Sequence, residues 1–153
     1  MKKQPSLAMF ILLVMGGGIA IGVVTAPGDW YANLEKPFFN PPNWIFAPVW
    51  TVLYLVISFV GWRVCDIEKN NPLMRLWGLQ LCLNFIWSPI FFGAQNPRLA
   101  FFVIGFLLVV ILLFIWSAWR NERISAMLFI PYLAWVGFAT TLNGAIYILN
   151  PTV

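Results

Sequence analysis

The sequence predicts an all-α integral membrane protein, a bundle of five transmembrane helices. Of its 153 residues, 61% are apolar and only 9% are charged, whereas about a quarter of the residues in a soluble domain are charged. Five long runs carry charge only at their margins, and each is close to the roughly 20 residues that a helix needs to cross a bilayer. Because barrel-type alternation is absent, helices are the consistent interpretation. The predicted spans are 6–26, 44–63, 75–93, 98–119 and 124–149, in a single transmembrane domain over 1–153.

The basic residues predict how the bundle is inserted. Of the nine Lys and Arg residues, only Lys36 and Arg98 fall on one side of the membrane. By the positive-inside rule the N-terminus is therefore cytoplasmic, and an odd number of spans places the C-terminus outside. The net charge of +4 follows from this topology and gives no support to nucleic-acid binding. The residues assigned to the inner side are Lys2, Lys3, Arg63, Lys69, Arg75, Arg120 and Arg123.

The first span is interpreted as a retained helix. Its apolar run is longer than the core of a cleavable signal, and a Pro-rich aromatic segment follows it instead of a soluble domain. Within this span Gly18 and Gly22 are four residues apart, which is the spacing that lets two membrane helices approach closely. Glycine is also simply frequent in membrane helices, so both interpretations stay open.

Residues 27–43 are the predicted outer loop between the first two spans. Asp29 is expected to cap a short helix that starts at Trp30. The prolines at 37, 41 and 42 are expected to keep residues 37–43 extended and stiff. Some aromatic residues here suit an interfacial belt, and others are expected to point inward and cover a cavity. The loop residues selected as candidate ligand contacts are Trp30, Tyr31 and Pro41.

Side chains at four-residue spacing indicate a cavity beneath this loop, because that spacing places them on one helix face. Amides are costly against lipid, so they should face the interior, where Asn84 and Asn143 either orient a ligand or bond one helix to another. Pro89 and Pro131 lie inside spans and are expected to kink them. An apolar aromatic cavity with a few amides has the general form of a small-molecule site. The stripes are Phe46, Trp50 and Tyr54; Gln80, Asn84 and Ser88, with Trp87 and Phe91 beside them; and Pro131, Trp135, Ala139, Asn143 and Tyr147.

The chain lacks the residues of classical catalysis. It has no histidine, no acidic residue within a span and no Ser or Cys beside a base, so acid–base, nucleophilic and metal-dependent chemistry have no candidates. We therefore predict no metal site and no required cofactor. Cys65 and Cys82 are interpreted as small apolar fillers. The absence of internal repeats and of charges within the spans argues against active transport.

Three blocks of the sequence resemble the TspO/translocator protein family, also called tryptophan-rich sensory proteins or peripheral-type benzodiazepine receptors. They are WYANLEKPFFNPPNWIFAPVWTVLY from Trp30, LNFIWSPIFFGAQN from Leu83 and PYLAWVGFATTLN from Pro131, and the similarity extends over essentially the whole chain. The resemblance implies a five-helix bundle, usually dimeric, with a ligand pocket beneath the loop between the first two helices. It also implies that the protein binds porphyrins such as protoporphyrin IX, as well as isoquinoline carboxamide and benzodiazepine-type drugs. Several members of the family also bind cholesterol.

The resemblance also implies site residues, carried over position by position. Trp50 and Trp135 match tryptophans implicated in a proposed light-dependent degradation of porphyrin by some bacterial members, and they are the candidate catalytic residues. Gly144 and Ile148 stand where animal members carry the Tyr and Arg of a proposed cholesterol motif, and Leu99 replaces a pocket tryptophan, so weaker cholesterol and drug binding is expected. The implied pocket comprises Ala20, Val23, Phe46, Ala47, Val49, Trp50, Trp87, Ser88, Phe91, Phe106, Trp135, Ala139, Leu142 and Asn143.

These observations predict a membrane receptor or sensor that binds porphyrins and other flat apolar ligands, with a role in tetrapyrrole transport or regulation. Two alternatives stay open: a light-dependent porphyrin-degrading enzyme, and a passive transporter of tetrapyrroles or lipids. The expected partners are a porphyrin or drug-like molecule, membrane lipid and a second copy of the chain in a homodimer, without nucleic acid. Basic inner loops and the lack of a transit segment favour the bacterial cytoplasmic membrane.

Overall fold

A computed structural model describes residues 5–65 and 72–151 and confirms the five-helix bundle. Five helical segments within these residues are long and apolar enough to cross a membrane, and their ends lie within three residues of the predicted ones. The elements in order are α1 (Leu7–Val24), α2 (Asp29–Asn33), the 3₁₀ turn η1 (Asn43–Ile45), α3 (Phe46–Cys65), α4 (Pro72–Ser88), the π-helical turn η2 (Pro89–Gly93), α5 (Pro97–Asn121) and α6 (Arg123–Leu149).

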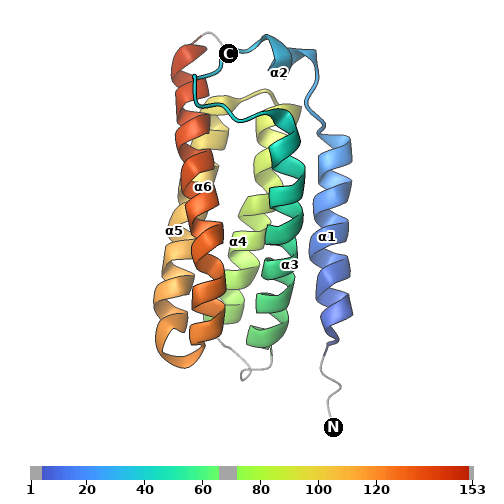
Figure 1. Cartoon of the computed structure of the whole chain (residues 1–153), viewed down its shortest axis with the longest axis vertical. Coiled ribbons are helices and arrows are strands. Elements are labelled where there is room, and N and C mark those ends of the chain that lie inside the picture. Colours follow the sequence, from blue (N-terminus) through green and yellow to red (C-terminus); the bar gives the residue numbers. More distant parts are fainter. Residues whose placement is uncertain (1–4, 66–71, 152–153) are drawn as a thin grey trace.

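The five long helices run side by side, and the short α2 lies across one end of the bundle (Figure 1). Helix α1 stands at the edge and packs on α3, whereas α5 packs along both α4 and α6. At the end opposite α2, the Arg63 guanidinium forms an ion pair with Glu122 at 3.1 Å, which ties α3 to the corner between α5 and α6.

The two groups of described charges lie at opposite ends of the bundle, as the sequence predicted. Lys36 and Arg98 lie at the α2 end of the bundle, while the described arginines of the other group lie at the opposite end, where α3 ends and α4 begins (Figure 1). The positive-inside rule predicts that this opposite end is the cytoplasmic one. Lys2, Lys3 and Lys69 belong to the same prediction but lie outside the described residues.

The bundle interior is aromatic and aliphatic, and so is much of its outer surface. Phe114 and Phe129 pack in the core with ring centroids 4.4 Å apart, next to the fully buried Tyr132. On the outside, large side chains such as Trp116 remain 77% exposed. In lipid this exposure carries no penalty, because the hydrocarbon tails are as apolar as the side chains.

Glycines allow two close contacts inside the bundle. Gly61 of α3 lies against the ring of Trp77, whose Nε1 donates to the Ile57 carbonyl at 2.9 Å. Gly18 of α1 lies against the ring of Tyr54 in the same way. The helix-contact interpretation of Gly18 is therefore correct within one chain, whereas a Cβ added at Gly22 would meet no described atom within 4 Å.

The outer loop differs from the prediction in two places. Helix α2 begins at Asp29 itself, with Gly28 as the capping residue, and the Asp29 side chain makes no capping bond. Its carboxylate instead lies in the first helical turn, where the helix dipole favours negative charge. The segment 37–43 is also not extended throughout. The Asn40 amide donates to the Pro37 carbonyl at 3.0 Å, because the intervening residues form a turn that satisfies backbone groups locally.

The two prolines inside spans behave differently from each other. Pro89 begins the wide turn η2, which is closed by the Ala94 amide donating to the Pro89 carbonyl at 2.8 Å. A proline has no N–H to continue the regular helical pattern, and this turn buries Phe91. Helix α6 runs without interruption past Pro131, which lies in a shallow outer groove between α3 and α6.

Candidate ligand-binding cavity

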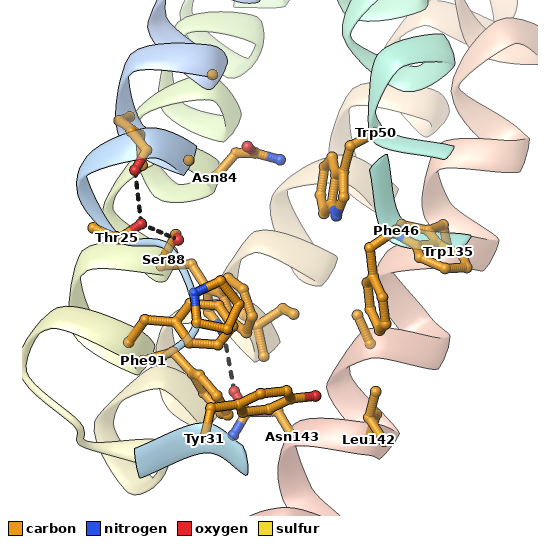
Figure 2. A pocket seen from close by; sticks show the side chains of 18 of the residues that line it. Thr25, Tyr31, Phe46, Trp50, Asn84, Ser88, Phe91, Trp135, Leu142 and Asn143 are labelled. Carbon is orange, nitrogen blue, oxygen red and sulfur yellow. Dashed lines mark hydrogen bonds between the residues drawn. The ribbon is translucent and has the colours of Figure 1, made fainter. Parts of the chain in front are cut away.

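A cavity of about 450 Å³ lies inside the outer half of the bundle, beneath α2. Its size is within the range of about 300–1,000 Å³ that is typical of small-molecule sites. Side chains from all five long helices, α2 and both short turns line it. Figure 2 shows Thr25, Asn84 and Ser88 on one side and Phe46, Trp50 and Trp135 on the other.

The walls of the cavity are mostly aromatic. The Trp87 and Phe91 rings stack with centroids 5.1 Å apart, and the Phe46 ring meets Trp135 edge to face at 5.9 Å. The indole Nε1 of Trp135 is buried and has no hydrogen-bond partner among the described residues. Such walls suit a flat apolar ligand, since aromatic rings favour stacked and edge-to-face contacts.

Tyr31 of α2 closes the outer end of the cavity (Figure 2). Its ring contacts Phe92 with centroids 5.3 Å apart, and Lys36 Nζ lies 4.7 Å from the ring centroid. Burial raises the pKa of the Tyr31 phenol above its usual range, so this side chain is neutral at physiological pH. The loop is also tied to α6, because the Asn150 side chain accepts from the Glu35 amide at 3.0 Å and donates to the Glu35 carbonyl at 2.9 Å.

A pair of hydroxyl groups joins α1 to α4 on the cavity wall. Thr25 Oγ1 lies 2.6 Å from Ser88 Oγ and also donates to the Ile21 carbonyl at 2.8 Å. The single Thr25 proton is therefore occupied, so Ser88 donates to Thr25 and its own oxygen can accept a bond from a ligand.

Asn143 ties three helices together beside the cavity. Its Oδ1 accepts from Trp87 Nε1 at 3.0 Å, and its Nδ2 donates to the Pro97 carbonyl at 2.8 Å. The interpretation that Asn143 bonds one helix to another is confirmed, because it joins α6 to α4 and α5. Asn143 also lines the cavity, and a role in orienting a ligand stays a prediction.

Asn84 belongs to a chain of four polar side chains that leads away from the cavity. Tyr54 Oη donates to Asn84 Oδ1 at 3.2 Å, and Asn84 Nδ2 donates to Tyr132 Oη at 2.9 Å. Tyr132 Oη in turn donates to Gln80 Oε1 at 2.9 Å. Only Tyr54 and Asn84 line the cavity, and the chain bonds α3, α4 and α6 together.

The structure brings twelve of the nineteen sequence-selected residues together around the cavity. They come from α2, α3, α4, η2 and α6, so the aromatic and amide stripes converge on one space. The twelve are Tyr31, Phe46, Trp50, Tyr54, Asn84, Trp87, Ser88, Phe91, Trp135, Ala139, Leu142 and Asn143.

Seven selected residues lie away from the cavity lining. Val23 and Phe106 are 74% and 53% exposed, because each points about half a turn away from the cavity-facing residues of its helix. Val49 faces the outer groove between α3 and α6, and Trp30 packs behind Phe91 with ring centroids 5.8 Å apart. The remaining three, Ala20, Pro41 and Ala47, are exposed or half-buried outside the lining.

The sequence reasoning missed the cavity face of α1. That face follows a pattern of three- and four-residue steps through Gly18, Ile21, Gly22 and Thr25, which is a regular helical stripe. From the sequence alone, Gly18 and Gly22 indicate only a possible helix contact. The other lining residues not selected are Pro27, Asn43, Phe92, Ile104, Leu107 and Ile146.

None of the described residues that line the cavity carries a charge. Among residues 5–65 and 72–151, no three His, Cys, Asp or Glu side chains are close enough together to hold a metal ion. The arrangement suits binding of a flat, largely apolar molecule that forms a few hydrogen bonds.

Comparisons with known proteins agree with this architecture. The TspO/MBR family profile matches residues 10–149. The chain is 41% identical to the tryptophan-rich protein TspO of Archaeoglobus fulgidus, over 92% of this chain and 94% of that protein. It is 32% identical to the tryptophan-rich sensory protein of Cereibacter sphaeroides, over 94% and 90%, and 35% identical to the human translocator protein, over 92% and 88%. The chain therefore belongs to the TspO/MBR family of membrane proteins.

Proposed function

We propose that this protein is a membrane receptor or sensor that binds porphyrins and similar flat apolar ligands in the cavity beneath α2. The observation that carries the proposal is an uncharged cavity whose opposite walls present Trp50 and Trp135 on one side and the Trp87–Phe91 stack on the other. A porphyrin offers a large aromatic face to such walls.

The absence of charge in the described lining constrains how a porphyrin would lie. Burying a carboxylate without a partner is costly, so the acidic side groups of protoporphyrin IX should remain at the outer end. There Tyr31 closes the cavity and Lys36 Nζ lies against its ring. The apolar edge of the macrocycle would then point towards Tyr54 and Leu107.

The cellular role that we propose is delivery or regulation of tetrapyrroles, and the protein needs no resident cofactor for it. A homodimer and a location in a bacterial cytoplasmic membrane remain predictions from the resemblance and the charge distribution. Drug-like molecules and membrane lipids are further proposed ligands, because the same apolar walls suit them.

Titration of the detergent-solubilised protein with protoporphyrin IX in the dark tests the proposal through quenching of tryptophan fluorescence. We expect saturable quenching, with affinity about tenfold weaker in Trp50→Leu and in Trp135→Leu, because each change removes an aromatic contact and buried area. Trp116→Leu is the matched control, since Trp116 faces outward and is 77% exposed. Quenching that does not saturate, or that is the same in all three variants, would contradict the proposed site.

Light-dependent degradation of bound porphyrin is a second candidate function, favoured by the position of Trp50 and Trp135 on the same cavity. Oxygen would be the oxidant and the porphyrin would be oxidised. Under illumination in air we expect porphyrin absorbance to fall faster with this protein than with the Trp50→Leu/Trp135→Leu double variant, compared at equal amounts of bound porphyrin. Equal rates would exclude a catalytic role of these tryptophans.

A further inference from the structure

The polar chain from Tyr54 to Gln80 ends in an unpaired group. Gln80 is fully buried, and its Nε2 has no hydrogen-bond partner among the described residues. Its Oε1 accepts the proton of Tyr132. A buried amide nitrogen without a partner is unfavourable, so the chain is not held firmly in this one direction.

The same four side chains can also bond in the opposite direction. An amide group keeps its shape when it rotates by 180° and exchanges its oxygen with its nitrogen. In the reversed chain, Gln80 Nε2 donates to Tyr132, Tyr132 donates to Asn84 Oδ1, and Asn84 Nδ2 donates to Tyr54. Three hydrogen bonds exist in either direction, and the unpaired atom becomes Gln80 Oε1 instead of Nε2.

The direction of the chain changes what Tyr54 offers to the cavity. In the observed direction Tyr54 donates its only proton to Asn84, so its oxygen can only accept a bond from a ligand. In the reversed direction Tyr54 accepts from Asn84, and its proton is free for a ligand that carries an acceptor.

We propose that Gln80, which does not touch the cavity, allows Tyr54, through Tyr132 and Asn84, either to accept a hydrogen bond from a ligand or to donate one. Gln80 is thus a positioning residue for ligand specificity, and this inference rests on the proposed function of the cavity as a small-molecule site. With glutamine present, the cavity accommodates a neutral ligand with either an N–H group or a carbonyl group at Tyr54.

Replacement of Gln80 by methionine fixes one direction. Methionine has a similar shape but cannot accept the Tyr132 proton as glutamine does. The only remaining partner of Tyr132 in the chain is Asn84, and Tyr132 then donates to Asn84 Oδ1, because in the observed direction its buried hydroxyl proton would have no acceptor in the chain. Asn84 Nδ2 consequently donates to Tyr54, which becomes a permanent donor towards the cavity.

Two flat tricyclic probes of equal size test this assignment in the full-length protein in detergent. Carbazole has an N–H donor, 9-fluorenone has a carbonyl acceptor, and fluorene, which has neither, is the reference. Both affinities are expressed relative to that for fluorene. In Gln80→Met we expect the relative affinity for fluorenone to rise about three- to tenfold and the relative affinity for carbazole to fall by a similar factor. Tyr54→Phe should abolish both preferences, and Leu79→Met, on the exposed neighbouring position of α4, should leave them unchanged.

A measurement without ligand separates this inference from the proposed function. The resonance Raman signal of Tyr54, taken as the difference from Tyr54→Phe, should change from that of a donating to that of an accepting phenol in Gln80→Met. An unchanged signal, or affinities for both probes that shift in the same direction, would overturn the inference. A changed signal with no saturable binding of any probe to the unmodified protein would support the switch in Tyr54 while contradicting the proposed function.

Discussion

Gly18→Leu is expected to destabilise the protein by about 3 kcal/mol and to abolish saturable porphyrin binding. A Cβ at this position would already overlap the ring of Tyr54, and extra bulk in a packed site costs about 1–3 kcal/mol or more. Tyr54 cannot easily move aside, because its ring packs on Trp50 at 5.4 Å and Phe85 at 6.4 Å and its hydroxyl is bonded to Asn84. Helix α1 must therefore move away from α3, which opens the cavity wall.

Thermal unfolding in detergent and the dark porphyrin titration check this prediction. Gly16→Leu is the matched control, because a Cβ at Gly16 meets no described atom within 4 Å and the residue is exposed on the same helix. We expect Gly16→Leu to be neutral or slightly stabilising, since leucine is the better helix former. Equal melting temperatures for the two variants would show that the contact between Gly18 and Tyr54 does not hold α1 in place.

The five helices were predictable because their physical cause is local in the sequence. A run of about 20 uncharged residues must be helical to satisfy its backbone in lipid, so charged margins such as Arg120 and Arg123 mark the helix ends closely. The 3₁₀ start at Asn43 and the turn near Pro37 depend on short-range bonds within the loop. The prediction that residues 37–43 are extended was based on their prolines alone and did not include these bonds.

The cavity was only partly predictable, because a membrane helix is apolar on its lipid-facing side as well as on its inner side. Polar and aromatic stripes still identified the correct faces of α3, α4 and α6, as with Asn84 and Asn143. On α1 and α5 the apolar residues offer no such contrast. Ile21 and Leu107 line the cavity, whereas Val23 and Phe106 do not, although all four side chains are apolar.

The bonding partners of the buried polar groups were also beyond the sequence. Tyr132 connects Asn84 to Gln80 across 48 and 52 residues of the chain, and nothing in its local sequence distinguishes it from a packing aromatic. The pairing requires α4 and α6 to face each other at one particular level, which is fixed only by the packing of the whole bundle.

Asn143→Leu is the other substitution with a large expected effect, because Asn143 is 2% exposed and satisfies groups on two other helices. Leucine of similar size would leave Trp87 Nε1 without its partner and would remove the second bond to the Pro97 carbonyl, and an unpaired buried group costs about 1–3 kcal/mol. We expect the free energy of unfolding to fall by about 2 kcal/mol, because hydrogen bonds of this kind have only modest measured strength in membranes. A porphyrin affinity about tenfold weaker should accompany it, because the Trp87 ring loses its fixed orientation.

Unfolding and titration of Asn143→Leu should be compared with Thr141→Val, a polar-to-apolar change two residues away on α6. Thr141 is exposed and bonds only to the Gly137 carbonyl of its own helix, as far as the described residues show, so this control should behave as the unmodified protein does. Asn143→Asp separates the two bonds, since a carboxylate still accepts from Trp87 but cannot donate to Pro97. If Asn143→Leu retained both stability and affinity, the bridge would be dispensable, and the orientation of Trp87 would have to come from its ring contacts with Phe91 and Phe92.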